Sequence, residues 1–167
     1  AAPQSMVAAA HPLAVEAGLE MLRRGGTAVD AAIAVQMVLG VVEPHASGIG
    51  GGGFLLHYDG ASHAITVYDG RETAPAGASP TMFLSADGKP LGYREAVASG
   101  MSVGVPGLLA MLELAHKEKG KLAWSELFAP ALATARDGSA VSSRPAAWLP
   151  RIPALREEQA IREAYFN

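Results

Sequence analysis

The chain has 167 residues, of which 50% are hydrophobic and 17% charged. This is ample apolar material for one core but few charges for a free surface, so we expect another chain to cover part of it. The net charge of −3, without a Lys/Arg block, argues against nucleic acid or an anionic membrane as a partner. The absence of cysteine excludes disulfides and thiol chemistry.

The sequences at both ends of the chain are typical of a longer polypeptide that has been cleaved. Ala1–Gln4 looks like a mature N-terminus left after cleavage at a small-residue site, although an artificial start would give the same pattern. This favours an exported protein, periplasmic or secreted. At the other end, Glu157–Asn167 stops inside a helical pattern without a C-cap. We therefore expect one piece of a larger polypeptide.

Two helices are predicted first. The stretch His11–Arg24 has a broad apolar face and ends at a Gly-Gly pair. Thr27 and Asp30 then form a capping box that opens a second helix over Ala28–Leu39, which Gly40 and a following proline should end. This helix is apolar on nearly all sides and should be covered. At about 12 residues it is too short to span a membrane.

A β-hairpin is predicted next. Phe54–Tyr58 and Ala64–Tyr68 have strand composition, and the turn-forming segment Asp59–His63 separates them. A third extended piece, Arg71–Ala74, follows and ends at Pro75. The rest of the chain is predicted to be loop over residues 77–99, a short strand at Ser102–Val105, a helix at Leu108–Lys119 with Pro106 in its first turn, a helical stretch at Ser125–Arg136 interrupted at Pro130, and a helix at Ala154–Phe166.

The glycine run Gly48–Gly53 contains only one other residue type, an isoleucine. Glycine costs folding entropy, so such a run is expected where backbone passes close to other chain segments or a ligand. A phosphate cradle is the alternative, but the run precedes a strand instead of following one and opening a helix. We favour close packing, with Gly50, Gly51 and Gly52 as structural residues near a site.

Arg71 follows the turn Asp69-Gly70 and offers a planar fork of donors suited to a carboxylate. The alternative role for Arg71 is an ordinary ion pair at the protein surface. If Arg71–Ala74 is a strand, Glu72 points to the opposite face and cannot be the same-face partner of Arg71. Glu72 is therefore placed among the structural residues near the site.

No complete catalytic set is visible in the sequence. The five histidines have no metal-ligand spacing, and no serine lies in a Gly-x-Ser-x-Gly elbow. Surface or core positions are the simplest interpretation of these histidines, so no metal and no cofactor are expected. The histidines are His11, His45, His57, His63 and His116.

Several ordered motifs resemble the large subunit of γ-glutamyltranspeptidases, and cephalosporin acylases of the transpeptidase-like class share them. Together they span most of the chain. The motifs are Val7–Ala14, Gly25–Ala32, Val42–Phe54, Gly70–Pro75, Val103–Gly107 and Ala123–Ala131.

The resemblance implies an α+β fold, the four-layer αββα fold of N-terminal-nucleophile hydrolases, to which this chain contributes part of the helical and sheet layers. It implies a precursor that cleaves itself into two subunits, with residues 1–167 as the N-terminal part of the large one and no internal domain boundary. The nucleophile is then a threonine at the N-terminus of the small subunit, and its own amine is the base. The resemblance further implies that no catalytic residue lies in this chain and that Arg71 binds the α-carboxylate of the γ-glutamyl group.

The sequence thus predicts a subunit of a γ-glutamyltransferase or glutathione hydrolase that acts on glutathione-like donors. A β-lactam side-chain acylase of the same fold is one alternative. A non-catalytic partner module that binds carboxylates through Arg71 is another.

Overall fold

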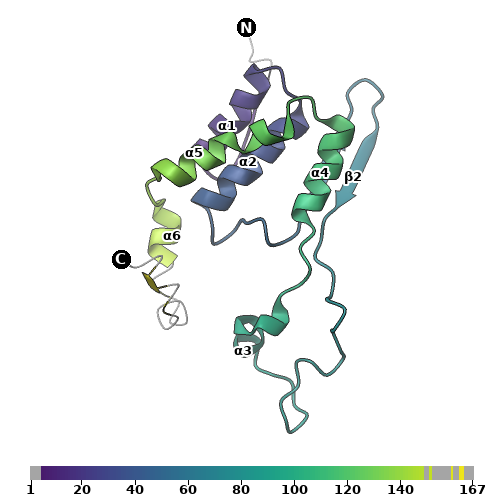
Figure 1. Ribbon diagram of the computed structural model, residues 1–167, viewed down its shortest axis with the longest axis vertical. Coiled ribbons are helices and arrows are strands. Elements are labelled where there is room, and N and C mark those ends of the chain that lie inside the picture. Colours follow the sequence, from purple (N-terminus) through teal and green to yellow (C-terminus); the bar gives the residue numbers. More distant parts are fainter. Residues whose placement is uncertain (1–4, 149–150, 152–158, 160–161, 164–167) are drawn as a thin grey trace. The chain divides into compact units, whose positions relative to one another are not determined.

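The computed structural model describes residues 5–148, 151, 159 and 162–163 (Figure 1). It divides into two compact units, one of Ala1–Gly48 with Gly120–Asn167 and one of Ile49–Lys119. The prediction that the chain has no internal domain boundary stays a prediction. The elements are α1 (Pro12–Arg23), α2 (Ala28–Val42), β1 (Phe54–Tyr58), β2 (Ile65–Asp69), α3 (Tyr93–Ala98), η1 (Gly100–Ser102), α4 (Leu108–Lys119), η2 (Trp124–Phe128), α5 (Ala129–Asp137) and α6 (Ser143–Trp148).

Helices α1 and α2 form the centre of the first unit and pack side by side (Figure 1). The first predicted helix is confirmed, and His11 caps it by accepting a hydrogen bond at Nδ1 from the Leu13 amide, 3.2 Å away. The core between the helices contains Met21 and Ile33, both with 0% exposure. Burial of such side chains, each giving about 1.5–3 kcal/mol, supplies most of the stability here.

The second helix begins as predicted and ends later. Its capping box is present, with Thr27 accepting from the Asp30 amide and Asp30 accepting from the Thr27 amide. The prediction that Gly40 ends the helix is wrong, because the helix continues to Val42. Tertiary packing outweighs the roughly 1 kcal/mol that a helical glycine costs, and Pro44 is the residue that prevents further extension. Among the described residues, no helix is long and apolar enough to cross a membrane.

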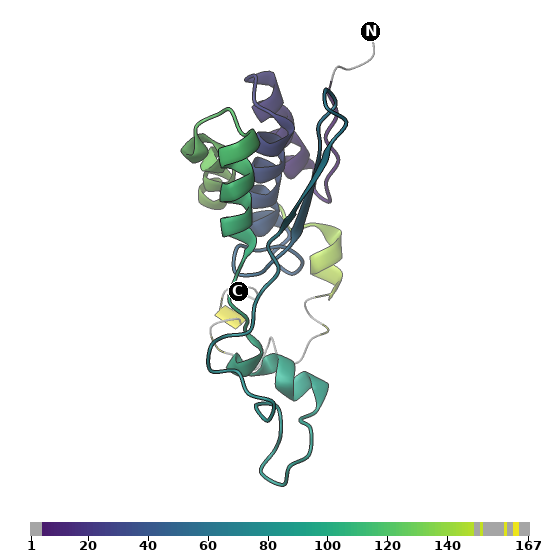
Figure 2. The ribbon, with the colours of Figure 1, turned by 90° about the vertical axis from the view of Figure 1, so that its right-hand side faces the viewer.

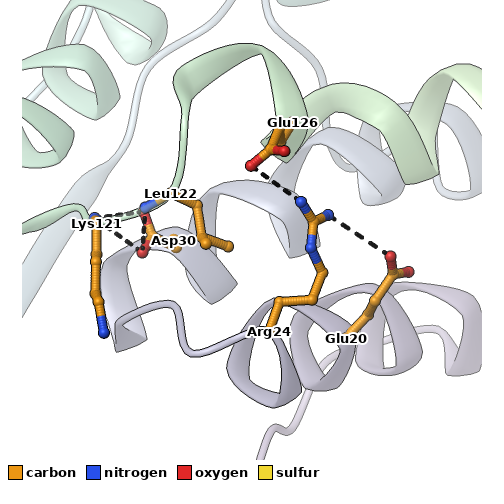
Figure 3. A network of polar contacts seen from close by, with 6 residues as sticks. All are labelled: Glu20, Arg24, Asp30, Lys121, Leu122 and Glu126. Atoms are coloured by element: carbon orange, nitrogen blue, oxygen red, sulfur yellow. Dashed lines mark hydrogen bonds and ion pairs between the residues drawn. The ribbon is translucent and has the colours of Figure 1, made fainter.

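A fully buried carboxylate joins distant segments of this unit (Figure 3). Asp30, which has 0% exposure, also accepts hydrogen bonds from the amides of Lys121 and Leu122, at 3.0 and 3.4 Å. Beside it, Arg24 forms an ion pair with Glu126 at 3.0 Å. The buried charge is stable because hydrogen bonds replace its hydration.

The predicted stretch Ser125–Arg136 is confirmed as helical, and its interruption has a simple form. A 3₁₀ turn, η2, leads directly into α5, where Pro130 occupies the first turn. That position tolerates proline because its N–H would have no helical partner. Helix α6 was not predicted, and the expected helix Ala154–Phe166 lies largely outside the described residues.

The second unit contains the predicted hairpin, displaced by one residue in β2. The strands pair antiparallel from Phe54 opposite Asp69 to Tyr58 opposite Ile65, and Figure 2 shows them as one narrow ribbon. Helix α4 lies against β2, and the Tyr68 hydroxyl donates to Glu118 of that helix at 2.7 Å.

Four expectations about this unit are corrected. The predicted strand at Arg71–Ala74 is reduced to one bridge between Thr73 and Val105. The strand predicted at Ser102–Val105 does not form, since Ser102 belongs to η1 and Val105 takes part only in that bridge. Helix α3 lies within the region expected to be loop. Pro106 precedes α4 by two residues and is not in its first turn. Short elements of three to six residues carry too little periodicity to be recognised.

Candidate functional site

The glycine run contacts the segment that carries Arg71. A Cβ added at Gly52 would lie 2.5 Å from the Glu72 carboxylate, 2.6 Å from the Gly70 carbonyl oxygen and 2.8 Å from the Glu72 amide nitrogen. Two of these three atoms belong to the backbone and cannot rotate away. Gly52 is therefore a position where only glycine lets the two segments approach.

The segment Gly70–Glu72 is enclosed from two further sides by glycine. A Cβ at Gly104 would lie 2.9 Å from the Glu72 Cβ, and one at Gly107 would lie 2.5 Å from the Gly70 carbonyl oxygen. The Gly51 carbonyl in turn accepts hydrogen bonds from the amides of Gly107, which precedes α4, and of Leu108, the first residue of α4, both at 3.2 Å. Backbone packing thus fixes the chain on either side of Arg71.

The close-packing interpretation of the glycine run is correct at Gly52 and fails at Gly50. A Cβ at Gly51 would meet the Glu72 carboxylate at 3.4 Å, close to ordinary contact. At Gly50 it would have nothing within 4 Å among the described residues. The sequence composition predicts close packing for the whole run, whereas the contacts in the structure require glycine only at Gly52.

Arg71 has a fixed backbone and an open side chain. Its amide donates to the Asp69 carboxylate at 2.9 Å, while 64% of its side chain is exposed. Its Nε lies 3.8 Å from Glu72 Oε2. The argument that excluded Glu72 as the same-face partner of Arg71 assumed a strand, and the segment is not a strand at these two residues, so side-chain alternation does not apply.

A cavity of about 390 Å³ opens beside Arg71. One part of its lining is polar, with Arg71, Glu72 and Thr73. The lining also includes apolar side chains, those of Met82, Phe83, Met101, Val103 and Pro75. Sequence reasoning missed this apolar wall, since its members lie in loops without periodicity. The arrangement suits a carboxylate that is joined to an apolar group.

The histidines form no metal site: no group of three or more metal-ligating side chains occurs in the part of the chain that the structure describes. His45 lies 3.4 Å from the buried Glu43, which also accepts a hydrogen bond from Ser142 at 3.1 Å. The carboxylate lies between the histidine and the serine, so this is not a nucleophile–base arrangement, in which the histidine would be central. Glu43 instead joins the end of α2 to the segment before α6.

The chain is similar to known proteins over most of its length. Residues 14–167 match the family model of γ-glutamyltranspeptidase. The chain is 49% identical over 138 residues to the glutathione hydrolase proenzyme of Bacillus subtilis, covering 83% of this chain and 24% of that protein.

Solved structures share the fold. The γ-glutamyltranspeptidase of Helicobacter pylori matches with a TM-score of 0.92 and 33% identity, over 100% of this chain and 48% of that one. The cephalosporin acylase of Bacillus halodurans matches with a TM-score of 0.68 and 25% identity, over 99% of this chain and 32% of that one. The predicted fold class, part of an α+β N-terminal-nucleophile hydrolase, is confirmed.

The chain spans about a quarter of the length of its curated relatives and about half of the H. pylori chain. The match to the family model nevertheless covers nearly all of it. The chain therefore belongs to the γ-glutamyltranspeptidase family.

Proposed function

We propose that this chain is the N-terminal part of the large subunit of an exported γ-glutamyltransferase or glutathione hydrolase. A precursor cleaves itself, and the new N-terminal threonine of the small subunit attacks the γ-carbonyl of the donor. The C–N bond breaks, the amine leaves with a proton, and water or an amino acid resolves the threonine ester. The proenzyme names of the relatives support the two-subunit arrangement.

Within this reaction the chain supplies Arg71, which binds the α-carboxylate of the γ-glutamyl group. The observation that carries the proposal is that Arg71 is an open cation beside a cavity, on a backbone that glycines fix. A guanidinium with its backbone held in place forms two parallel hydrogen bonds to a carboxylate at little entropic cost.

Glu72 positions this arginine. Its side chain packs against Gly52 and Gly104, and its carboxylate faces Nε of Arg71 at 3.8 Å. An ion pair at this distance is longer than a hydrogen bond and weak in energy, but it biases the orientation of the guanidinium. With Nε turned toward Glu72, the two terminal nitrogens of Arg71 remain directed to a ligand.

The test is Arg71→Ala in the assembled enzyme. Loss of a charge-assisted pair removes roughly 1.5 to 3 kcal/mol, which is at least a tenfold decrease in kcat/KM for γ-glutamyl donors. Arg71→Lys should also be poor, because lysine keeps the charge and loses the fork. Donors without the α-carboxylate should lose far less. Equal losses on both kinds of donor would mean that Arg71 supports the fold or a subunit interface.

The likeness to a cephalosporin acylase favours a second candidate, a β-lactam side-chain acylase. Such an enzyme would also bind a carboxylate, but its donor acid need not carry an α-amino group. Steady-state turnover of γ-glutamyl-p-nitroanilide and of glutaryl-cephalosporin would separate the two. A clear preference for the second substrate would replace our proposal with this one.

The two-subunit proposal has its own test. Intact mass spectrometry of the native enzyme should detect a second chain that begins with threonine, and the large-subunit chain alone should have no turnover. Full activity of the isolated 167-residue chain would refute the assignment of the nucleophile to a partner.

A further inference from the structure

The cavity beside Arg71 is larger than a carboxylate requires. Its volume of about 390 Å³ lies in the range typical of small-molecule sites. Arg71 lines the cavity, and so do Met82, Phe83 and Met101, which we call the apolar wall. Phe83 and Met101 are 37% and 45% exposed. Large apolar side chains that stay open beside a charged group mark a binding surface more often than a chance exposure.

Hydrogen bonds hold the apolar wall in place. The Phe83 carbonyl accepts from the Leu91 amide at 2.8 Å, and Leu84 forms a β-bridge with Pro90. In η1, next to Met101, the Ser102 hydroxyl donates to the carbonyls of Val97 and Ser99, at 3.0 and 2.9 Å. A wall built on paired backbone keeps its shape when a ligand leaves, so little ordering cost opposes binding.

The size of a γ-glutamyl group keeps its leaving amine within the dimensions of this cavity. By standard bond lengths the α-carboxylate and the γ-amide nitrogen are at most roughly 6 Å apart. A donor whose carboxylate is bound by Arg71 therefore carries its amine within reach of the same cavity. The apolar lining matches an apolar substituent on that amine.

We propose that the Met82–Phe83–Met101 wall is a subsite for an apolar or aromatic amine, so that the enzyme prefers γ-glutamyl amides of such amines over those of small ones. This inference rests on the proposed function, since it takes the carboxylate end of the donor to lie at Arg71. In this proposal, contact with the wall selects the leaving amine of the donor, and Arg71 selects the γ-glutamyl group by its carboxylate.

The experiment compares kcat/KM for γ-glutamyl-benzylamide and γ-glutamyl-methylamide in the assembled enzyme. Both leaving amines are neutral in the amide and differ mainly in apolar size. We expect a preference of about tenfold for the benzylamide. Phe83→Ala and Met101→Ala should each reduce that preference by about threefold, with little change in methylamide turnover. Tyr93→Ala, at a residue 82% exposed and outside the cavity lining, is the matched control and should leave the ratio unchanged.

Other outcomes distinguish a failure of the proposed subsite from a failure of the proposed function. Normal turnover with the same ratio in every variant would overturn the subsite and leave the function intact. If Phe83→Leu and Met101→Leu, which keep apolar volume, also impair assembly, the wall is buried against another part of the enzyme and the subsite is refuted. Absence of turnover with either amide in the parent enzyme would refute the proposed function itself.

Discussion

The two units of the chain obtain their order in opposite ways. In the first unit, helices bury large side chains completely, and Met21, Ile33 and Leu127 all have 0% exposure. In the second unit, backbone approaches backbone at Gly52 and Gly107, while apolar residues on one face of the hairpin such as Leu56 and Val67 remain 69% and 60% exposed. The first unit should thus be sensitive to the removal of atoms, and the second to their addition.

This difference also separates stability from recognition. In the helical unit even the buried carboxylate of Asp30 accepts hydrogen bonds from two segments of the chain. The second unit keeps an open cation and an open apolar face. A region with a rigid backbone and with charged and apolar side chains exposed is suited to bind a ligand or another chain.

Gly52→Val should have the largest effect. The new Cβ would lie within 2.6 Å of the Glu72 carboxylate and the Gly70 carbonyl, so the segment that carries Arg71 must move or the unit must fail to fold. We expect little or no mature protein, measured as soluble yield and as subunit cleavage. Gly50→Val is the matched control and should fold, since a Cβ there meets no atom of the described residues within 4 Å. Normal maturation of Gly52→Val with only weaker substrate affinity would indicate a ligand cradle instead.

Val67→Glu tests whether the open hairpin face is covered in the assembled enzyme. A carboxylate buried there without a partner would cost roughly 3–5 kcal/mol, so the yield of the complex should decrease strongly. Ala61→Glu, in the exposed hairpin loop, should have no effect. If size-exclusion chromatography finds both variants fully assembled, this face is open to solvent in the enzyme.

Asp30→Ala tests the first unit by removal. It leaves the amides of Thr27, Lys121 and Leu122 without their carboxylate acceptor, at a cost of roughly 3 kcal/mol. The melting temperature should decrease by several degrees. Asp30→Asn keeps one acceptor oxygen, so its melting temperature should lie between those of the parent protein and of Asp30→Ala. Glu16→Ala, which breaks an exposed ion pair with Arg23, is the control and should be nearly neutral.

Tyr68→Phe should have the smallest effect, about 1 kcal/mol, because it removes one hydrogen bond to Glu118. That hydrogen bond, with burial, raises the pKa of Tyr68 above its usual value. The stabilisation is therefore complete below the unfolded pKa of about 10 and is lost as the pH rises through the higher folded pKa. Unfolding curves of the two proteins should differ at pH 8 and converge at strongly alkaline pH. A constant difference across that range would contradict the assignment.

Local sequence was sufficient for the longer elements. The capping box of Thr27 and Asp30, the apolar face of α4 and the composition of the hairpin strands all act between residues close in the chain, and each prediction was confirmed to within a few residues. Short elements such as α3 were not predicted, because six residues are less than two helical turns.

The candidate site divides in the same way. The sequence by itself marked Arg71, Glu72 and the glycine run, and it determined the family, because their residue types and spacing are local properties. Only the tertiary structure decided that Gly52, and not Gly50, touches Glu72, that Glu72 faces Arg71, and that Phe83 and Met101 share a cavity with it. The residues that these contacts bring together are up to 30 positions apart in sequence, from Arg71 to Met101. They depend on how loops close in space, for which neither composition nor periodicity carries information.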